Sequence, residues 1–155
     1  MSTPSLKEQI QQHCHSQILA RIETALQAIS SAESSSQEDT KSSAGDKFET
    51  GREMMQQELN RHQNLLLEAR KMGQTLENLS SLGAASTADQ VVAGSLVECD
   101  EALFYLAVGL GKINVEDREV LVISPTAPVG QLLLGRKVGD SIRFNSQTYR
   151  IVQLS

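Results

Sequence analysis

The feature that most constrains the fold is an apolar stripe that recurs every three or four residues along two long stretches. The first stretch begins at Ser5, and the second runs from near Gly45 to about Leu79. Such steps place the apolar side chains on one face of a helix, while the other faces here are polar. Each stretch therefore predicts a long helix with a single seam. The expected seam residues are Leu6, Ile10, Cys14, Ile18, Ile22, Ala25, Ile29 and Ala32, then Met55, Leu59, His62, Leu66, Ala69, Gly73, Leu76 and Ser80.

Between the two stripes, residues 34–43 are small and polar and show no periodicity, which predicts a turn. Two single-seam helices joined by a short connection bury their stripes most simply against each other. We therefore expect residues 1–80 to form an antiparallel coiled-coil hairpin whose tip lies near residues 40–52.

A change in composition marks a second domain. Residues 81–92 are rich in small and polar side chains and predict a linker. Residues 93–155 contain short β-rich runs at 95–99, 102–108, 119–123, 141–144 and 148–152. Pro128 and Gly135 frame one short helix, and Asn145, Ser146 and Gln147 predict the turn of a hairpin. The predicted fold class is α+β, with the helical hairpin followed by a small antiparallel β-sheet domain carrying one short helix.

Composition excludes several function classes. A formal net charge of -5 disfavours free nucleic acid as the main partner and favours a basic protein surface. Aromatic residues make up 3% of the chain and Trp is absent, so a deep aromatic-lined pocket is not expected. No segment approaches the roughly 20 apolar residues of a membrane span, and the polar start does not resemble a signal peptide. We expect a cytoplasmic monomer without membrane contact.

Cysteine and histidine offer little sign of catalysis. Cys14 and Cys99 fall in different predicted elements, so no disulfide framework is expected. His13 and His15 flank Cys14, but neighbouring residues on a helix diverge by about 100° and do not face one substrate. His62 lies on the second seam without another His or Cys four residues away, which favours a packing role over metal binding.

Two carboxylates near the predicted tip are the strongest candidates for chemistry. Asp46 and Glu49 are three residues apart, so on a helix they share one face and can converge on one cation or one water. Converging hard oxygen ligands suit Mg²⁺. The same spacing is also that of a capping box at a helix start. The two interpretations are compatible, and the sequence leaves both open.

Two motifs of this sequence resemble those of the bacterial Gre transcription elongation factors. Residues 45–49, Gly-Asp-Lys-Phe-Glu, are similar to the Gly-Asp-x-x-Glu tip of that family. Residues 127–137, followed by Val-Gly-Asp at 138–140, are similar to its Ser-Pro-hydrophobic-Ala-x-x-Leu-hydrophobic-Gly-Lys signature. The order of the motifs agrees over nearly the whole chain. The resemblance implies a coiled-coil hairpin followed by an FKBP-like domain.

The resemblance also implies a function. A Gre-type factor binds RNA polymerase, enters its secondary channel and stimulates cleavage of backtracked RNA, with indirect contact to the 3′ end of the transcript. By this resemblance Asp46 would help hold a second Mg²⁺ and Glu49 would orient or deprotonate the attacking water. Thr126, Ala127 and Pro128 would dock on the polymerase. The chain itself would be no enzyme and would bind no cofactor alone, because the metal would be held only in the complex.

Two alternatives remain open. The first is a regulator or inhibitor that binds the channel without stimulating cleavage. It is suggested by residues 50–53, which are Thr-Gly-Arg-Glu where the family has Asn-Ala-Glu-Tyr after the tip acids. A peptidyl-prolyl isomerase is the second and more distant one, because only the implied fold supports it. The aromatic residues of the C-terminal half are Phe104, Tyr105, Phe144 and Tyr149, and most of them fall at strand positions expected in the core.

Overall fold

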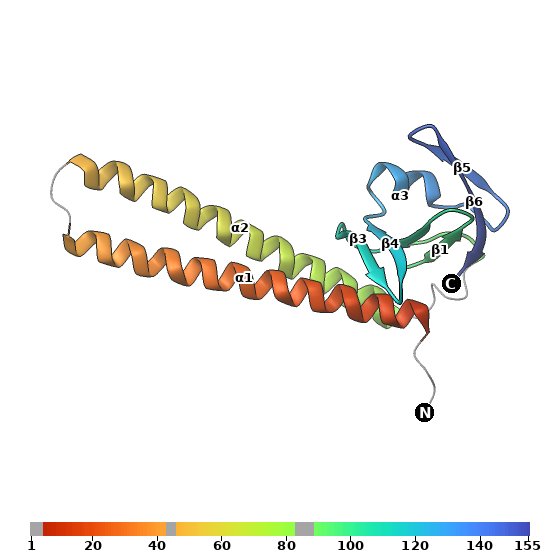
Figure 1. Ribbon diagram of the computed structural model, residues 1–155, viewed down its shortest axis with the longest axis horizontal. Coiled ribbons are helices and arrows are strands. Elements are labelled where there is room, and N and C mark those ends of the chain that lie inside the picture. The colour runs from red at the N-terminus through yellow and green to blue at the C-terminus, as the bar shows by residue number, and fades with distance from the viewer. Residues whose placement is uncertain (1–4, 43–45, 83–88) are drawn as a thin grey trace, which may run out of the picture. The chain divides into compact units, whose positions relative to one another are not determined.

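The computed structural model describes residues 5–42, 46–82 and 89–155, with the side chains of 35–42, 46–50 and 80–82 outside the described set. Two long helices precede a six-stranded, mostly antiparallel sheet with one short helix, which confirms the predicted α+β fold (Figure 1). The chain divides into two compact units. We call Ser16–Gly73 the arm, and the described residues of 1–15 and 74–155 the sheet unit. In the described part of the chain, no helix has the length and apolarity that a membrane span requires.

The two long helices are α1, Leu6–Ser42, and α2, Asp46–Leu82, and each has 37 residues. A reciprocal capping box opens α1: Glu8 N–H donates to Ser5 Oγ at 3.2 Å, and Ser5 N–H donates to Glu8 Oε2 at 3.3 Å. The turn expected at residues 34–43 is wrong, because α1 continues through that stretch to Ser42. The stretch contains no Gly or Pro, and extending an existing helix costs far less than starting one.

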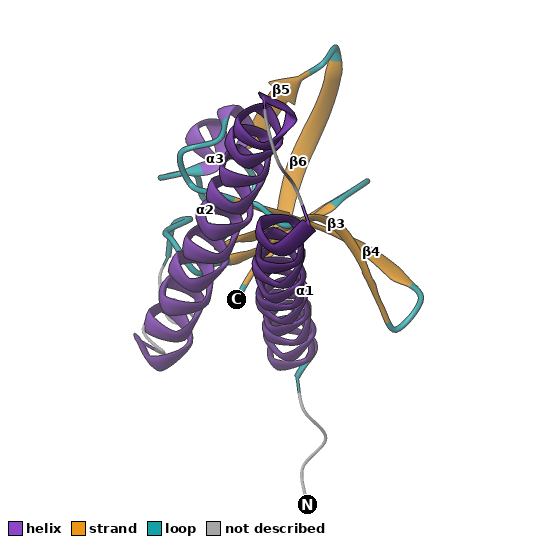
Figure 2. Cartoon of the chain, turned by 90° about the vertical axis from the view of Figure 1, so that its left-hand side faces the viewer, coloured by secondary structure: helices purple, strands orange, loops and turns teal. Residues whose placement is uncertain are grey.

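Within the arm, α1 and α2 run side by side in opposite directions (Figures 1 and 2). Arg21 Nη1 of α1 donates to Met72 Sδ of α2 at 3.8 Å. Nearer the connection between the helices, Ala32 and Met55 line one groove. The predicted seams are confirmed, because every predicted position is buried or half-buried except Ser80, which lies outside the described side chains.

The sheet unit contains six strands in the spatial order β3-β4-β2-β1-β6-β5. Neighbouring strands are antiparallel apart from β2 and β4, which run parallel because β3 lies between them in sequence and takes the edge position. The sequence pattern did not predict β3, a five-residue strand that lies directly before an acidic turn. The strands are β1 Leu96–Cys99, β2 Leu103–Leu106, β3 Gly111–Val115, β4 Arg118–Ile123, β5 Ser141–Phe144 and β6 Gln147–Leu154.

Two hairpins close with two-residue turns of unusual backbone conformation. Figure 2 shows the β3–β4 turn, where Glu116 and Asp117 have φ of 50° and 63°. Asn145 and Ser146 have φ of 53° and 66° between β5 and β6. Positive φ at both central residues matches the right-handed twist of the strands. The hairpin predicted at Asn145 is confirmed, with Gln147 already part of β6.

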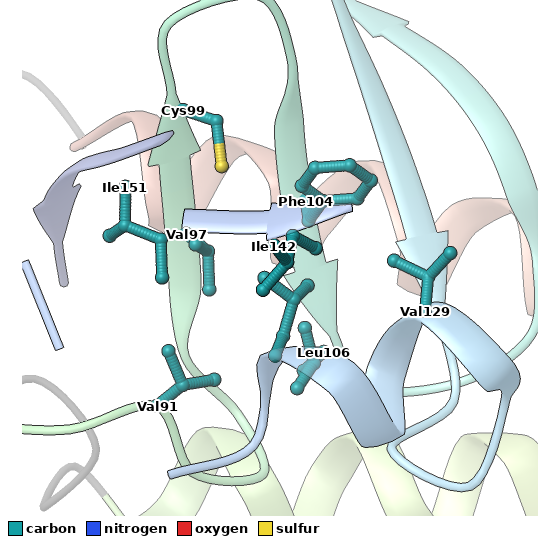
Figure 3. Close-up of a cluster of buried hydrophobic side chains, with 9 residues drawn as sticks. Val91, Val97, Cys99, Phe104, Leu106, Val129, Ile142 and Ile151 are labelled. Carbon is teal, nitrogen blue, oxygen red and sulfur yellow. The ribbon is translucent and has the colours of Figure 1, made fainter. Parts of the chain in front are cut away.

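The short helix α3, Pro128–Leu133, begins with proline in its first turn, and Gly135 follows it with φ of 81°. Both features confirm the predicted helix. Helix α3 covers one face of the sheet, where the core gathers (Figure 3). Val91, from the end of the expected linker, is part of this core. The core residues are Val91, Val97, Cys99, Phe104, Leu106, Val129, Leu133, Ile142 and Ile151.

The first turns of α1 contact the opposite side of the strands. Tyr105 alternates with Phe104 along β2, so its side chain leaves the sheet on the other face. Tyr105 is fully buried, and its hydroxyl accepts a hydrogen bond of 3.2 Å from Gln11 Nε2. Burial raises the pKa of the Tyr105 hydroxyl, so it stays protonated near neutral pH.

Candidate functional site

The end of the arm where α2 begins contains the two predicted tip acids. Asp46 is the first residue of α2, and Glu49 follows within the first turn. This spacing puts both residues on one side of the helix. Their side chains lie outside the described residues, as does all of Gly45. The capping role and the metal-binding role both stay predictions.

The donor set at this end is compatible with a shared metal. Asp46 and Glu49 offer carboxylate oxygens, which are the ligands that Mg²⁺ prefers, but Mg²⁺ takes about six. Across the described residues, no group of three or more His, Cys, Asp or Glu side chains could hold a metal ion. A magnesium ion held by this pair would therefore need further ligands from a partner or from water.

The Ser124–Pro128 loop contains the predicted docking residues Thr126, Ala127 and Pro128. Thr126 and Pro128 are exposed, whereas Ala127 is half-buried and caps α3. The Ser124 and Thr126 hydroxyls lie 2.8 Å apart, and Thr126 N–H donates to Ser124 Oγ at 3.2 Å. Ala127 N–H donates to the Ser124 carbonyl at 3.0 Å. These bonds fix the loop locally, as hydroxyl side chains commonly do in turns.

Two residues of helix α3 contact the same loop. A Cβ added to Gly130 would lie 2.3 Å from the Ser124 carbonyl oxygen, so only glycine permits this approach. Gln131 Nε2 donates to the Thr126 carbonyl oxygen at 3.0 Å. The sequence analysis missed Gly130 and Gln131 as loop supports. The sequence signal for an ordered loop at this place was Ser-Pro-Thr at 124–126, which is typical of a turn held by Ser and Thr hydroxyls.

The cysteines are poor nucleophiles. Burial raises the pKa of the Cys14 thiol to about 11. Burial, with the negative charge of Asp100, raises the pKa of the Cys99 thiol to about 11. Both thiols are protonated at neutral pH, and a protonated thiol is unreactive.

His62 has the packing position that its place on the seam predicts. It is half-buried, and its Nε2 lies 3.8 Å from Glu58 Oε1 on the preceding turn of α2. No metal-binding cluster includes it among the described residues.

The four aromatic residues considered for an isomerase do not surround one pocket. Phe104 and Tyr149 form an edge-to-face pair with ring centroids 5.5 Å apart. Phe144 packs at the margin of the same core, whereas Tyr105 lies on the other face of the sheet. An aromatic cage of all four is therefore absent.

Comparisons with known proteins give structural neighbours only. No protein-family model matches the chain, and neither does any curated protein. The GreA factor homolog 1 (Gfh1) of Thermus thermophilus has 17% identity and a TM-score of 0.35, covering 91% of this chain and 94% of its own. A structure described as the transcription factor Gfh1 has 22% sequence identity and a TM-score of 0.34, and the match covers 90% of this chain and 92% of that chain. Thermus aquaticus Gfh1 has 20% sequence identity and a TM-score of 0.33, and the match covers 87% of this chain and 94% of that chain.

Proposed function

We propose that this chain is a Gre-like transcription factor that binds RNA polymerase and inserts the arm into its secondary channel. The observation that carries the proposal is the start of α2 at Asp46, where the two long helices of the arm connect. The part of α2 within the arm, residues 46–73, is about 40 Å long at a rise of about 1.5 Å per residue, enough to carry a side chain into a larger assembly. The two sequence motifs support the same function.

The proposed chemistry belongs to a composite active site. Asp46 would supply an oxygen ligand to a magnesium ion that the polymerase binds weakly, and Glu49 would orient or deprotonate the attacking water. Magnesium supplies Lewis-acid stabilisation of charge on the phosphate when it is bound. The chain alone would be no enzyme, because its pair of acids gives too few ligands to hold the ion.

The Ser124–Pro128 loop would provide the docking contact. Its exposed Thr126 is held by hydrogen bonds to Ser124 and from Gln131, so docking would cost little ordering entropy. The loop itself is neutral, and the net charge of -5 would favour a basic partner surface.

Transcript cleavage in stalled polymerase complexes tests the proposal. The wild-type chain should accelerate release of the RNA 3′ fragment, and Asp46→Asn should abolish the acceleration while polymerase binding is unchanged. Glu53→Gln, which removes an exposed carboxylate one turn farther along α2, is the matched control and should retain activity. Thr126→Lys should weaken binding instead. Failure of the wild-type chain to bind polymerase would refute the function altogether.

A channel-binding regulator without cleavage activity is the second candidate. The observation that favours it is the Thr-Gly-Arg-Glu sequence at 50–53, which places the cation Arg52 close after the acids. A regulator of this kind would bind polymerase and slow initiation or elongation, with no stimulated cleavage for Asp46→Asn to remove. The same cleavage assay therefore separates the two candidates.

A further inference from the structure

A cleft of about 550 Å³ lies on the sheet unit, and no residue of the Ser124–Pro128 loop lines it. It occupies the end of the core face near Cys99 and Phe104, whereas Val91 and Leu106 lie at the other end of the cluster (Figure 3). Residues from β1, β2, β3, β4 and β6 line it. The cleft is therefore built on the rigid sheet.

Part of the floor of the cleft is apolar. Phe104 and Tyr149 meet edge to face there, and Ala102 and Leu121 complete the surface as half-buried residues. Tyr149 OH donates to Gln147 Oε1 at 3.2 Å, which fixes the ring against the sheet. The apolar part of the floor can contact one apolar side chain of a ligand.

The basic side chains of the rim are already paired. Lys112 Nζ lies 3.2 Å from Glu119 Oε1, and Arg118 Nη2 lies 2.7 Å from Glu98 Oε1. An anionic ligand would have to break one of these pairs to gain a partner. The rim therefore disfavours anions.

The acidic side chains of the rim exceed the basic ones. Asp100 and Glu101 form the turn between β1 and β2 and are exposed. Asp100 Oδ1 accepts a hydrogen bond from Arg150 N–H at 3.1 Å, and Glu101 accepts one from the Gln147 amide. Neither carboxylate forms an ion pair with a basic side chain of the described chain. Two negative charges at one end of the cleft are thus left for a cationic ligand.

We infer that this cleft binds an extended segment of a partner protein in which a bulky apolar residue is followed closely by Lys or Arg. The apolar side chain contacts Ala102, Leu121 and Tyr149. The basic side chains reach Asp100 and Glu101. The site is independent of the polymerase proposal, because neither the tip acids nor the Ser124–Pro128 loop contributes to it.

Peptide binding to the full-length chain tests the inference. The probe is a fluorescein-labelled heptapeptide with a central Phe-Lys-Lys sequence between Gly and Ser residues, measured by fluorescence polarisation at low salt. Two control peptides replace Phe by Ser or both Lys by Glu. We expect the probe to bind at least tenfold more tightly than either control peptide. Amide chemical shifts of residues 99–104 and 118–121 should move on titration.

Paired protein variants locate the site. Asp100→Asn with Glu101→Gln should weaken probe binding about fivefold to tenfold. Glu116→Gln, an exposed carboxylate on the β3–β4 turn outside the cleft, should leave binding unchanged. Circular dichroism shows whether each variant is folded. Equal binding of the Phe and Ser peptides would overturn the inference. An equal loss of probe binding in the Asp100 and Glu101 double variant and in Glu116→Gln would mean general charge attraction and would also overturn it, as would the absence of probe binding.

Discussion

The arm and the sheet unit differ in how their side chains are buried. In the arm, the fully buried hydrophobic residues of the described part are Ile18, Ala25 and Ala69, two of which are alanines. In the sheet unit, a continuous cluster packs on one face of the strands and Tyr105 is buried on the other. The arm thus depends on local helix formation along a thin seam, whereas the sheet unit depends on a cooperative core.

This difference suits two different tasks. A thin two-helix arm can carry polar residues at its end without a large core behind them, which the proposed tip function requires. A packed sheet can hold a loop and a cleft in fixed geometry, which docking requires. Substitutions in the two regions should therefore have unequal effects on stability.

Leu133→Ala should have the largest effect. Leu133 is fully buried between α3 and the sheet, and such truncations cost about 2–5 kcal/mol. Urea unfolding followed by circular dichroism measures the loss. Leu65→Ala in the arm is the matched control. Leu65 is 51% exposed, so this variant should lose well under half as much free energy of unfolding. Equal losses would remove the contrast between the two regions.

Alkaline pH should destabilise the sheet unit through its buried thiols. The folded pKa of Cys14 and of Cys99 is about 11 against an ordinary value of 9.0, so the unfolded chain loses these protons first. This contribution to stability is fully present below pH 9 and is lost as the pH rises toward 11. Between pH 8 and pH 10 we expect a loss of about 1 kcal/mol for each thiol.

Urea unfolding at both pH values, under reducing conditions, measures this loss. The double variant Cys14→Ala with Cys99→Ala is the control and should show a smaller pH dependence. The same dependence in both proteins would assign the effect to other groups.

Tyr105→Phe tests the contact between the first turns of α1 and the sheet. The change removes the hydroxyl that accepts the Gln11 hydrogen bond, and a bond of this kind contributes about 1 kcal/mol. Tyr149→Phe removes a hydroxyl whose bond to Gln147 is exposed, so it should cost less. Unfolding midpoints in urea distinguish the two. A larger loss in the second variant would contradict the assigned role of Tyr105.

Gly51→Ala should stabilise the arm, and this is the smallest effect. Gly51 lies inside α2, and an added Cβ would meet nothing within 4 Å. Alanine in place of glycine in a helix gains about 0.5–1 kcal/mol. Helical ellipticity during heating measures it. Gly73→Ala is the comparison, since its Cβ would contact Ile18 at 3.4 Å and adds packing to the same propensity gain. A loss of helicity in Gly51→Ala would show that this turn needs glycine.

The sequence predicted most of the local structure because local rules dominate there. The seam periodicity predicted both long helices, and the proline and glycine around α3 predicted its ends. The turn expected at 34–43 was wrong because polar composition alone does not end a helix. The β3 strand was missed because its five residues are stabilised by pairing with β4, a contact that the sequence does not display.

The candidate sites divide in the same way. The spacing of Asp46 and Glu49 and the presence of Thr126 and Pro128 were readable from the sequence. The supports of the loop were not, because Gly130 meets Ser124 only after α3 packs on the sheet. The cleft was also unpredictable, since its residues come from five strands.

By itself the sequence determined the two seamed helices, the framed short helix and the tight hairpin at Asn145, because each depends on interactions between residues close along the chain. Only the tertiary structure decided the parallel pairing of β2 with β4, the burial of Tyr105 against Gln11 and the surplus of acids at the cleft. These depend on which distant segments meet, and that is set by packing of the whole core rather than by any single stretch of residues.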